Sequence, residues 1–271
     1  MIPSSPTPIS SPTAIRCTLS GTSTGSRESA SDAGPGAPLT APGTSPDDLK
    51  RAAAAAAISR ISSDSIIGLG TGSTVRPLLE LLAQGLKSGS LRGVVGVPTS
   101  EDTATRCRAL GIPLTTLDDH PVLDVAIDGA DEVGPGLGLI KGLGGALLRE
   151  KLVALAAREF VIIADESKRV RKLGTRAPLP VEVIPFGWTT HLEFFRKLGA
   201  EPVQRLSGGN AYRTDSGNFI VDCRFPKGMA DPSRVARALD KRPGIVDHGL
   251  FIGMADLAYI AAPGGVKVIR R

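Results

Sequence analysis

Between residues 65 and 164, short apolar runs alternate with segments of helical pattern, and this alternation constrains the fold more than any other feature of the chain. The apolar runs, each of which predicts a buried strand, are 65–70, 94–97, 123–127 and 160–164. The helical segments between them are 73–82, 101–110 and 146–158, and residues 112–115 predict a further extended piece. Strands separated by helices pair in parallel, so we expect an α/β fold with a doubly wound, mostly parallel, Rossmann-like sheet.

A helix is expected to open the ordered part of the chain at Ser45. Ser45 is a favoured N-cap residue, Pro46 suits the first helical position, and Asp47 and Asp48 place acidic groups in the first turn. The Ala-rich run that follows continues the helix to about residue 61. The ordered chain is therefore predicted to begin at residue 45.

From residue 179 onward the pattern changes to paired strands and helices. The expected elements are a strand at 180–184, a helix at 190–198, a hairpin through Ser216-Gly217 into 219–222, and a helix at 231–240. This order predicts a smaller inserted α+β lid domain over 179–249. We expect the runs 250–252 and 257–260 to return to the first sheet, which gives a catalytic domain of 45–178 plus 250–271.

Residues 1–44 differ in composition from the rest of the chain. They consist largely of Ser, Thr, Pro, Gly and Ala, with Arg16 and Arg27 but no acid before Glu28. This composition cannot bury enough apolar surface to fold and is typical of an organellar transit peptide, here a chloroplast one. The alternative is a plain disordered tail on a cytoplasmic protein.

Composition argues against several classes of partner. The formal net charge of +5 comes from scattered basic residues, and aromatic residues make up only 4% of the chain, so no nucleic-acid partner is expected. No apolar run reaches the length of a bilayer span, which predicts no membrane partner. The three cysteines and three histidines are widely dispersed, so neither a disulfide framework nor a metal site is expected.

A glycine-rich segment lies between the first predicted strand and the next helix. Glycines at 68, 70 and 72 precede Ser73 and Thr74, and such a turn before a helix suits a phosphate group. It lacks the glycine spacing and the later acid of a dinucleotide site, and the lysine of an NTP-binding loop. The segment therefore indicates either a phosphate cradle or a purely structural tight turn.

Charged residues follow the strand at 123–127. Asp128, Asp131 and Glu132 fall at the carboxyl edge of the predicted sheet, where open α/β folds bind ligands, although a solvated acidic turn would have the same pattern. Lys141 lies in a second glycine-rich turn, either facing a developing oxyanion or simply exposed. Glu150 falls on an apolar helix face, so it either pairs with a buried cation or has a raised pKa suited to proton transfer.

Five motifs of the chain, taken together, resemble the ribose 5-phosphate isomerase A family. They are Gly-Leu-Gly-Thr-Gly-Ser-Thr (68–74), Asp-Gly-Ala-Asp-Glu (128–132), Lys-Gly-Leu-Gly-Gly-Ala-Leu-Leu-Arg-Glu-Lys (141–151), Ala-Asp-Glu-Ser-Lys (164–168) and Leu-Pro-Val-Glu-Val-Ile-Pro (179–185). The resemblance extends from Leu49 to Val268. The wording at 97–100 and 117–121 is most similar to plant and algal members, which agrees with the predicted leader.

The resemblance implies an enzyme that interconverts ribose 5-phosphate and ribulose 5-phosphate, a reaction of the pentose phosphate pathway and the Calvin cycle, without a cofactor. It implies Glu150 as the proton-carrying base, Asp128 and Asp131 as substrate-handling acids, and Lys141 as the cation beside the reacting oxygens. The implied substrate-binding residues are Lys50, Thr71, Gly72, Ser73, Thr74, Asp128, Gly129, Ala130, Asp131, Lys141, Gly142, Leu143, Gly144 and Lys168. Leu143 stands where many members have glycine, which leaves the backbone contacts of that loop open. The family further implies a homodimer or a dimer of dimers.

The chemistry agrees with this resemblance, because an aldose to ketose conversion needs only a base that moves a proton between adjacent carbons and groups that stabilise the enediolate. The sequence leaves two alternatives. A sugar-phosphate sensor on a similar fold would not need Glu150, and an amino-sugar phosphate deaminase or coenzyme A transferase would need a catalytic His or a transferase carboxylate motif that the chain lacks.

Overall fold

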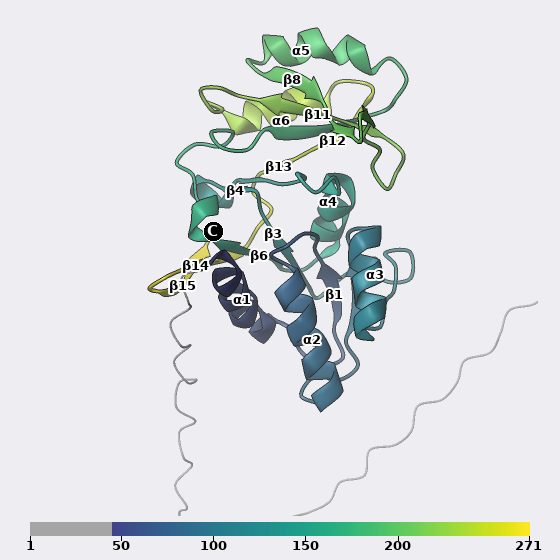
Figure 1. Ribbon diagram of the computed structural model, residues 1–271, viewed down its shortest axis with the longest axis vertical. Coiled ribbons are helices and arrows are strands. Elements are labelled where there is room, and N and C mark those ends of the chain that lie inside the picture. Colours follow the sequence, from purple (N-terminus) through teal and green to yellow (C-terminus); the bar gives the residue numbers. More distant parts are fainter. Residues whose placement is uncertain (1–44) are drawn as a thin grey trace, which may run out of the picture. The chain divides into compact units, whose positions relative to one another are not determined.

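Figure 1 shows the protein as a computed structural model that describes residues 45–271. The predicted leader over 1–44 lies outside the described residues. Residues 45–271 belong to one compact unit. Within this part of the chain, no helix is long and apolar enough to cross a membrane.

The largest sheet has six strands, and its topology confirms the predicted α/β fold. In spatial order the strands are β2 (Val95–Pro98), β1 (Ile66–Leu69), β3 (Val125–Gly129), β6 (Phe160–Asp165), β14 (Leu257–Ala262) and β15 (Gly265–Arg270). All neighbours are parallel except β14 and β15, which form an antiparallel edge that the sequence did not predict. The chain moves outward from β1 to β2 and then resumes on the other side with β3, so the strand order reverses between β1 and β3.

Four helices accompany this sheet: α1 (Pro46–Ala57), α2 (Arg76–Ser88), α3 (Glu101–Leu110) and α4 (Leu147–Ala156). The start of α1 and both ends of α3 agree with the prediction, whereas α1 ends at Ala57, earlier than the predicted end near residue 61. The Ser45 side chain accepts from the Asp48 backbone at 3.1 Å, and Gly111 ends α3 in the left-handed conformation with φ of 73°. Helix α2 begins at Arg76 rather than Ser73, because the preceding residues form the loop that leaves β1.

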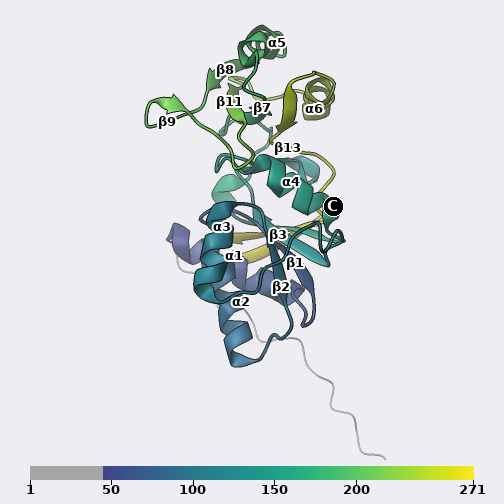
Figure 2. The same cartoon turned by 90° about the vertical axis from the view of Figure 1, so that its right-hand side faces the viewer.

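The two faces of the sheet are covered by different elements. Because successive side chains of a strand point to opposite faces, Ile127 joins the core formed with α1 and α2, whereas Ala126 joins the core formed with α4. Seen from the side in Figure 2, α4 lies between the six-stranded sheet and the upper part of the molecule, and it contacts β3, β7 and β12.

The upper part contains a second sheet of four antiparallel strands, β12 (Ile245–His248), β7 (Leu179–Val183), β11 (Phe219–Arg224) and β8 (Glu201–Gln204). Helices α5 (Leu192–Lys197) and α6 (Pro232–Asp240) contribute to its apolar core, as the paired strand and helix pattern predicted. A small hairpin of β9 (Leu206–Ser207) and β10 (Asn210–Ala211) follows β8. The edge strand β8 was not predicted, because its side chains alternate between exposed and half-buried positions without an apolar run.

Residues 250–252 do not return to the first sheet, so that prediction was wrong. Leu250 and Phe251 form β13, which pairs with β5 (Leu139–Ile140), and β5 pairs with β4 (Glu132–Val133) in a separate three-stranded sheet. The chain already lies beside β5 just before residue 250, because the Lys141 N–H donates to the Gly249 carbonyl at 2.9 Å. The prediction for 257–260 was confirmed by β14.

Short turns of 3-10 helix connect these elements at Ile58–Arg60, Pro135–Leu137, Glu166–Lys168 and Trp188–His191. The predicted extended piece at 112–115 contributes only a single bridge, between Leu114 and Gly96.

Candidate active site

The site lies where the strand order of the six-stranded sheet reverses, between β1 and β3. Ligands of open α/β sheets bind at such a point, outside the carboxyl ends of the strands, because the loops from the two strands diverge there. The loop after β1 runs from Gly70 to Thr74, and the carboxyl end of β3 with the residues after it carries Asp128 to Asp131. The two segments predicted to carry chemistry therefore lie side by side.

The Gly70 loop is tied to Asp128. The Thr71 and Gly129 backbone N–H groups donate to Asp128 Oδ1 at 3.1 and 2.7 Å. A Cβ at Gly70 would lie 2.0 Å from the same oxygen, so only glycine allows this close approach.

A cluster of hydroxyl groups supports the same loop from the side of β2 and α3. The Thr71 hydroxyl lies 2.7 Å from that of Thr99, 2.8 Å from Ser100 and 3.2 Å from Thr103. Thr103 also donates to the Gly70 carbonyl at 2.9 Å. These supporting residues were not predicted. Their signal was the run of hydroxyl residues after the strand at 94–97, at the same carboxyl edge as the acids.

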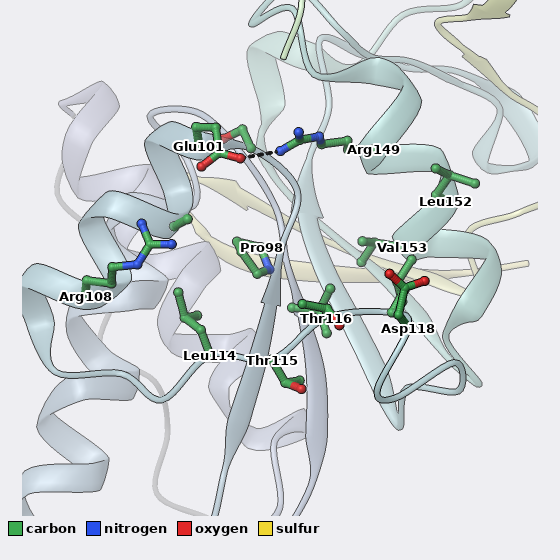
Figure 3. A pocket seen from close by; sticks show the side chains of 14 residues that line it. Pro98, Glu101, Arg108, Leu114, Thr115, Thr116, Asp118, Arg149, Leu152 and Val153 are labelled. Atoms are coloured by element: carbon green, nitrogen blue, oxygen red, sulfur yellow. Dashed lines mark hydrogen bonds and ion pairs between the residues drawn. The ribbon is translucent and has the colours of Figure 1, made fainter. Parts of the chain in front are cut away.

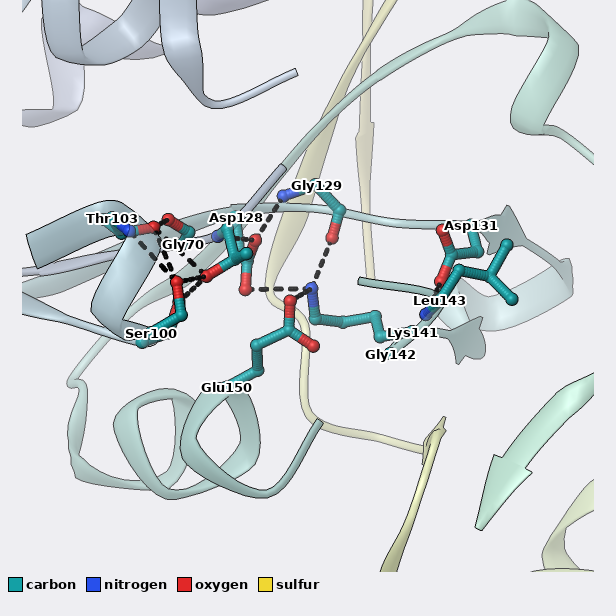
Figure 4. A network of polar contacts seen from close by, with 12 residues as sticks. Gly70, Ser100, Thr103, Asp128, Gly129, Asp131, Lys141, Gly142, Leu143 and Glu150 are labelled. Atoms are coloured by element: carbon teal, nitrogen blue, oxygen red, sulfur yellow. Dashed lines mark hydrogen bonds and ion pairs between the residues drawn. The ribbon is translucent and has the colours of Figure 1, made fainter. Parts of the chain in front are cut away.

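A buried lysine links the end of β3 to helix α4 (Figure 4). The Lys141 ammonium lies 2.8 Å from Asp128 Oδ2 and 3.3 Å from Glu150 Oε1, and it donates to the Gly129 carbonyl at 2.6 Å. Its side chain is only 2% exposed. Burial alone would lower the pKa of Lys141, but the neighbouring Asp128 and Glu150 carboxylates outweigh it and raise that pKa. The amine therefore remains a cation in the site.

Glu150 reaches the site from the first turn of α4 and is buried. Its Oε1 faces Lys141, whereas its Oε2 has no hydrogen-bond partner among residues 45–271. Burial raises the pKa of Glu150 to about 8; Lys141 opposes this shift, and the negative charges of Asp128 and Asp131 add to it. Both interpretations offered by the sequence apply at once: Glu150 pairs with a buried cation and has a raised pKa.

Asp131 faces the glycine-rich turn that follows Lys141. The Leu143 backbone N–H donates to Asp131 Oδ2 at 3.0 Å, and Figure 4 shows the two facing each other. Burial raises the pKa of Asp131, while this N–H and the cations Lys141 and Lys168 act in the opposite direction. Gly142 allows the turn, because it has a φ of +101° and a Cβ there would lie 2.7 Å from Leu147 Cβ.

These groups surround a cavity of about 100 Å³. The residues that line it are Thr71, Gly72, Ser73, Thr74, Gly129, Ala130, Asp131, Lys141, Gly142, Gly144, Glu150 and Lys168. All of them were predicted from the sequence. Asp128 lies behind the wall, in contact with Lys141.

Two predicted residues are placed differently. Lys50 does not line the cavity; it lies on α1, where its ammonium contacts Asp47 at 3.0 Å. Leu143 contributes its backbone N–H to the site, but its side chain does not line the cavity and the residue is 43% exposed.

A larger hollow of about 680 Å³ lies beside α3 and α4 (Figure 3). Its walls combine apolar side chains such as Leu114 and Val153 with an exposed ion pair, in which Arg149 lies 2.8 Å from Glu101. It contains no buried cation between carboxylates. We therefore assign the chemistry to the smaller cavity, because size alone identifies no reactive group.

The arrangement suits proton transfer next to a carbonyl group. A carboxylate with a raised pKa and an unpartnered oxygen acts as a base, and a permanent cation beside it stabilises a developing oxyanion. Among the described residues, no group of three or more His, Cys, Asp or Glu side chains is placed to hold a metal ion.

Comparison with known proteins gives consistent matches. Residues 95–265 match the family model of ribose 5-phosphate isomerase A (phosphoriboisomerase A). The chain is 55% identical over 218 residues to ribose-5-phosphate isomerase A of Roseiflexus castenholzii, covering 80% of this chain and 93% of the relative. It is 45% identical over 233 residues to an Arabidopsis thaliana protein named probable ribose-5-phosphate isomerase 3, chloroplastic, covering 84% of each chain.

Solved structures agree. A structure of D-ribose-5-phosphate isomerase in complex with phospho-erythronic acid matches with a TM-score of 0.82 and 38% identity, covering 84% of this chain and 100% of that chain. Ribose 5-phosphate isomerase from Plasmodium falciparum matches with a TM-score of 0.80 and 41% identity, covering 83% and 99% of the two chains.

Proposed function

The chain belongs to the ribose 5-phosphate isomerase A family and interconverts ribose 5-phosphate and ribulose 5-phosphate; we propose that Glu150 is the base that carries the proton between carbon 2 and carbon 1. The observation that carries this proposal is the buried contact of Glu150 with Lys141, which leaves Glu150 Oε2 without a partner among the described residues. A raised pKa favours uptake of a proton from carbon by this carboxylate.

The reaction begins from the open-chain aldehyde. Glu150 takes the proton from carbon 2, the electrons of that bond form the double bond between carbons 1 and 2, and the carbonyl oxygen becomes an oxyanion next to Lys141. A proton then passes from the oxygen on carbon 2 to the oxygen on carbon 1 beside the Lys141 ammonium, which Asp128 holds from behind the cavity wall. Glu150 returns its proton to carbon 1, which leaves the ketone at carbon 2. Asp131 assists the opening of the sugar ring before these steps.

The remaining contacts hold the substrate in register. We assign the loop from Thr71 to Thr74 and the Lys168 ammonium to the polar and phosphate groups of the substrate, since both line the cavity. Phosphate binding away from the reacting carbons contributes to the rate by fixing their position. A relative has been solved in complex with phospho-erythronic acid. The carboxylate of such an acid has two oxygens on one carbon and resembles the planar enediolate, so this compound suits as a probe of binding.

Glu150→Gln tests the assignment. Glutamine keeps the shape of the side chain but cannot accept a proton, so turnover should fall by at least roughly 10³-fold, within the range that positioned acid–base groups supply. Exchange of the carbon 2 hydrogen with solvent should fall in parallel, while phospho-erythronic acid still binds. If turnover stayed within about tenfold of the parent, a difference of only about 1.4 kcal/mol, Asp128 would become the candidate base.

We also propose that residues 1–44 direct the protein to the chloroplast and that the enzyme works as a homodimer or a dimer of dimers, without nucleic-acid or membrane partners. A related plant protein is named chloroplastic. A chain beginning at Ser45 should retain activity but should not enter isolated chloroplasts, whereas import of the shortened chain would contradict the assignment. Light scattering of the purified protein checks the oligomeric state.

The division into a catalytic domain (45–178 plus 250–271) and a smaller domain (179–249) is likewise a proposal. It is supported by the apolar core of the four-stranded sheet, most of whose buried residues lie between 179 and 249. Limited proteolysis should cut first near residues 178 and 249, and cleavage inside either domain beforehand would contradict it.

A further inference from the structure

One arginine of the four-stranded sheet region reaches the turn that follows Lys141. Arg205 lies between β8 and β9. Its Nη1 donates to the carbonyl oxygen of Gly142 at 3.1 Å and to that of Leu143 at 2.9 Å. A side chain from the four-stranded sheet region thus contacts the backbone of the turn that borders the cavity at the edge of the six-stranded sheet.

The orientation of this guanidinium is fixed by a second contact. Arg205 Nε and Nη2 donate to the two carboxylate oxygens of Asp222, on β11, at 2.8 and 2.5 Å. The two side chains are only 13% and 23% exposed. A two-point pair of this kind holds the planar group in one orientation, which leaves Nη1 aimed at the two carbonyls.

The same peptide unit is held from the opposite side. The Gly142 carbonyl accepts from Arg205, and the N–H on the other end of that peptide bond, which belongs to Leu143, donates to Asp131. Hydrogen bonds at both ends of a peptide strengthen each other, because each increases the polarity of the group. One peptide bond therefore connects the hydrogen bond of Arg205 to that of Asp131.

Two further contacts come from the stretch that follows Arg205. The Tyr212 hydroxyl packs against Gly145, where a Cβ would lie 2.0 Å from it. Asp215 accepts from the Glu101 backbone N–H at 2.9 Å and lies 3.6 Å from Arg149. The segment from 205 to 215 thus contacts the glycine-rich turn and helices α3 and α4. Among its described residues, only Arg205 donates hydrogen bonds to the carbonyl groups of the turn.

We propose that Arg205 is a positioning residue for the isomerase reaction: it fixes the peptide between Gly142 and Leu143, and through it Asp131, in the arrangement that binds the sugar phosphate. Arg205 does not line the cavity, so it acts on the substrate only through this turn. The inference rests on the proposed role of Asp131 and the glycine turn in binding substrate.

Arg205→Ala should raise the Michaelis constant more than it lowers turnover. Without the guanidinium, the turn occupies its binding geometry for only a fraction of the time, and the Michaelis constant rises by the inverse of that fraction. Losing hydrogen bonds from a charged donor predicts a rise of roughly 10- to 100-fold. At saturating substrate the turn is held in its binding geometry, so turnover should change by less than about threefold.

Arg213→Ala is the matched control. Arg213 belongs to the same region, stacks on Phe219 at 4.9 Å and donates to the Gly217 carbonyl at 2.8 Å, but it has no bond to the turn. Its removal should leave both kinetic constants within about twofold of the parent, because exposed contacts of this kind contribute little.

Rescue separates positioning from a general loss of packing. Millimolar guanidinium should lower the Michaelis constant of Arg205→Ala toward the parental value and leave Arg213→Ala unaffected. Arg205→Lys should fall between parent and alanine variant, since an ammonium cannot bind Asp222 and both carbonyls in the same fork. Asp222→Asn, which keeps Arg205 but loosens it, should give a smaller rise than Arg205→Ala.

The proposal is overturned if Arg205→Ala matches Arg213→Ala in Michaelis constant, or if it loses turnover alone and guanidinium restores nothing. Should Arg205→Ala fail to fold, the lysine and Asp222→Asn variants carry the same test, and unchanged Michaelis constants in both would refute it. Binding of phospho-erythronic acid, followed by calorimetry, keeps the two proposals apart. It should weaken in Arg205→Ala and persist in Glu150→Gln, whatever the outcome for the base.

Discussion

Helix α4 and the four-stranded sheet each carry a buried glutamate, and the two glutamates differ in what surrounds them. Glu150 at the edge of the six-stranded sheet and Glu182 in the four-stranded sheet both have a pKa raised by burial, and each has an Oε2 with no hydrogen-bond partner among the described residues. Glu182 accepts from neutral groups, the Thr214 hydroxyl at 2.8 Å and the Asn218 amide at 2.9 Å. Glu150 faces a cation and lines a cavity.

This difference shows that a raised pKa does not by itself identify a catalytic base. Burial has the same effect on the pKa of any carboxyl group, whether the group serves packing or chemistry. A base also needs access to the substrate and a nearby charge that stabilises what its action produces. Of the two glutamates, only Glu150 combines a raised pKa, access to the cavity and a neighbouring cation.

The most severe test of the comparison is removal of the cation beside Glu150. Lys141→Met leaves Asp128 and Glu150 buried without their partner, so we expect turnover to fall roughly 10²- to 10³-fold and the free energy of unfolding to fall by about 3–5 kcal/mol. Lys151→Met is the parallel change near Glu182, because Lys151 pairs at 2.5 Å with Asp247, which lies opposite Glu182 on the neighbouring strand. It should cost stability but lower turnover by less than tenfold. Steady-state kinetics and urea unfolding of both variants decide the matter, and equal losses of turnover would break the comparison.

If a functional side chain is identified by its position on the cavity and not by burial alone, Lys168 should contribute to substrate binding. Lys168 is half-buried and lines the cavity. Loss of one charge-assisted contact to substrate should raise the Michaelis constant of Lys168→Ala by roughly 10- to 150-fold, about 1.5–3 kcal/mol. The neighbouring exposed Arg169 provides the control, since Arg169→Ala should leave that constant unchanged. An unaltered Michaelis constant for Lys168→Ala would place this lysine outside the binding site.

The pH dependence of activity should report Glu150 and not Glu182. The base must be ionised, so kcat/KM should fall about tenfold for each pH unit below a midpoint near the Glu150 pKa of about 8. Lys141 helps to hold that pKa down, so its removal should move the midpoint to higher pH. A Glu182→Gln variant with a shifted midpoint would contradict the assignment.

The smallest effect is expected from Glu182→Gln itself. Glutamine keeps an acceptor for Thr214 and Asn218, so turnover should stay within twofold and the free energy of unfolding should change by less than about 1 kcal/mol. The folded pKa of Glu182 is raised above its unfolded value, so the stabilisation it provides is present at acidic pH and is lost as pH rises through the folded pKa. Thermal unfolding of the variant should therefore be less sensitive to rising pH than that of the parent.

Features that depend on neighbouring residues could be predicted from the sequence. Helix α3 was predicted with both of its ends, and in the structure Ser100 and Gly111 fix those ends through the residues beside them. Strands β1, β2, β3 and β6 coincide with the predicted apolar runs, and the residues that follow these strands meet at one edge because parallel strands align their carboxyl ends. This rule brought Asp128, Asp131 and the glycine loops together correctly.

Features that depend on distant pairing could not be predicted. Strand β13 pairs with β5, more than a hundred residues earlier in the chain. Its two apolar residues would suit pairing with β5 or with the six-stranded sheet equally well. The contact of Arg205 with the glycine turn arises in the same way. Its side chain is ordinary in sequence and acquires a role only through the topology.

The buried contact of Lys141 with Asp128 and Glu150 has a consequence for how charge moves during turnover. With Glu150 ionised, the group carries one positive and two negative charges, and the substrate enters with reacting carbons that are neutral. When Glu150 takes the proton, its negative charge disappears and an equal charge appears on the substrate oxygens beside Lys141. The total charge enclosed by the protein stays constant during this proton transfer, and the negative charge moves only a short distance. The surrounding dipoles therefore need little reorientation. Ionic strength should accordingly have little effect on turnover, whereas the Michaelis constant should rise with salt, because only the arriving phosphate crosses the region that mobile ions screen.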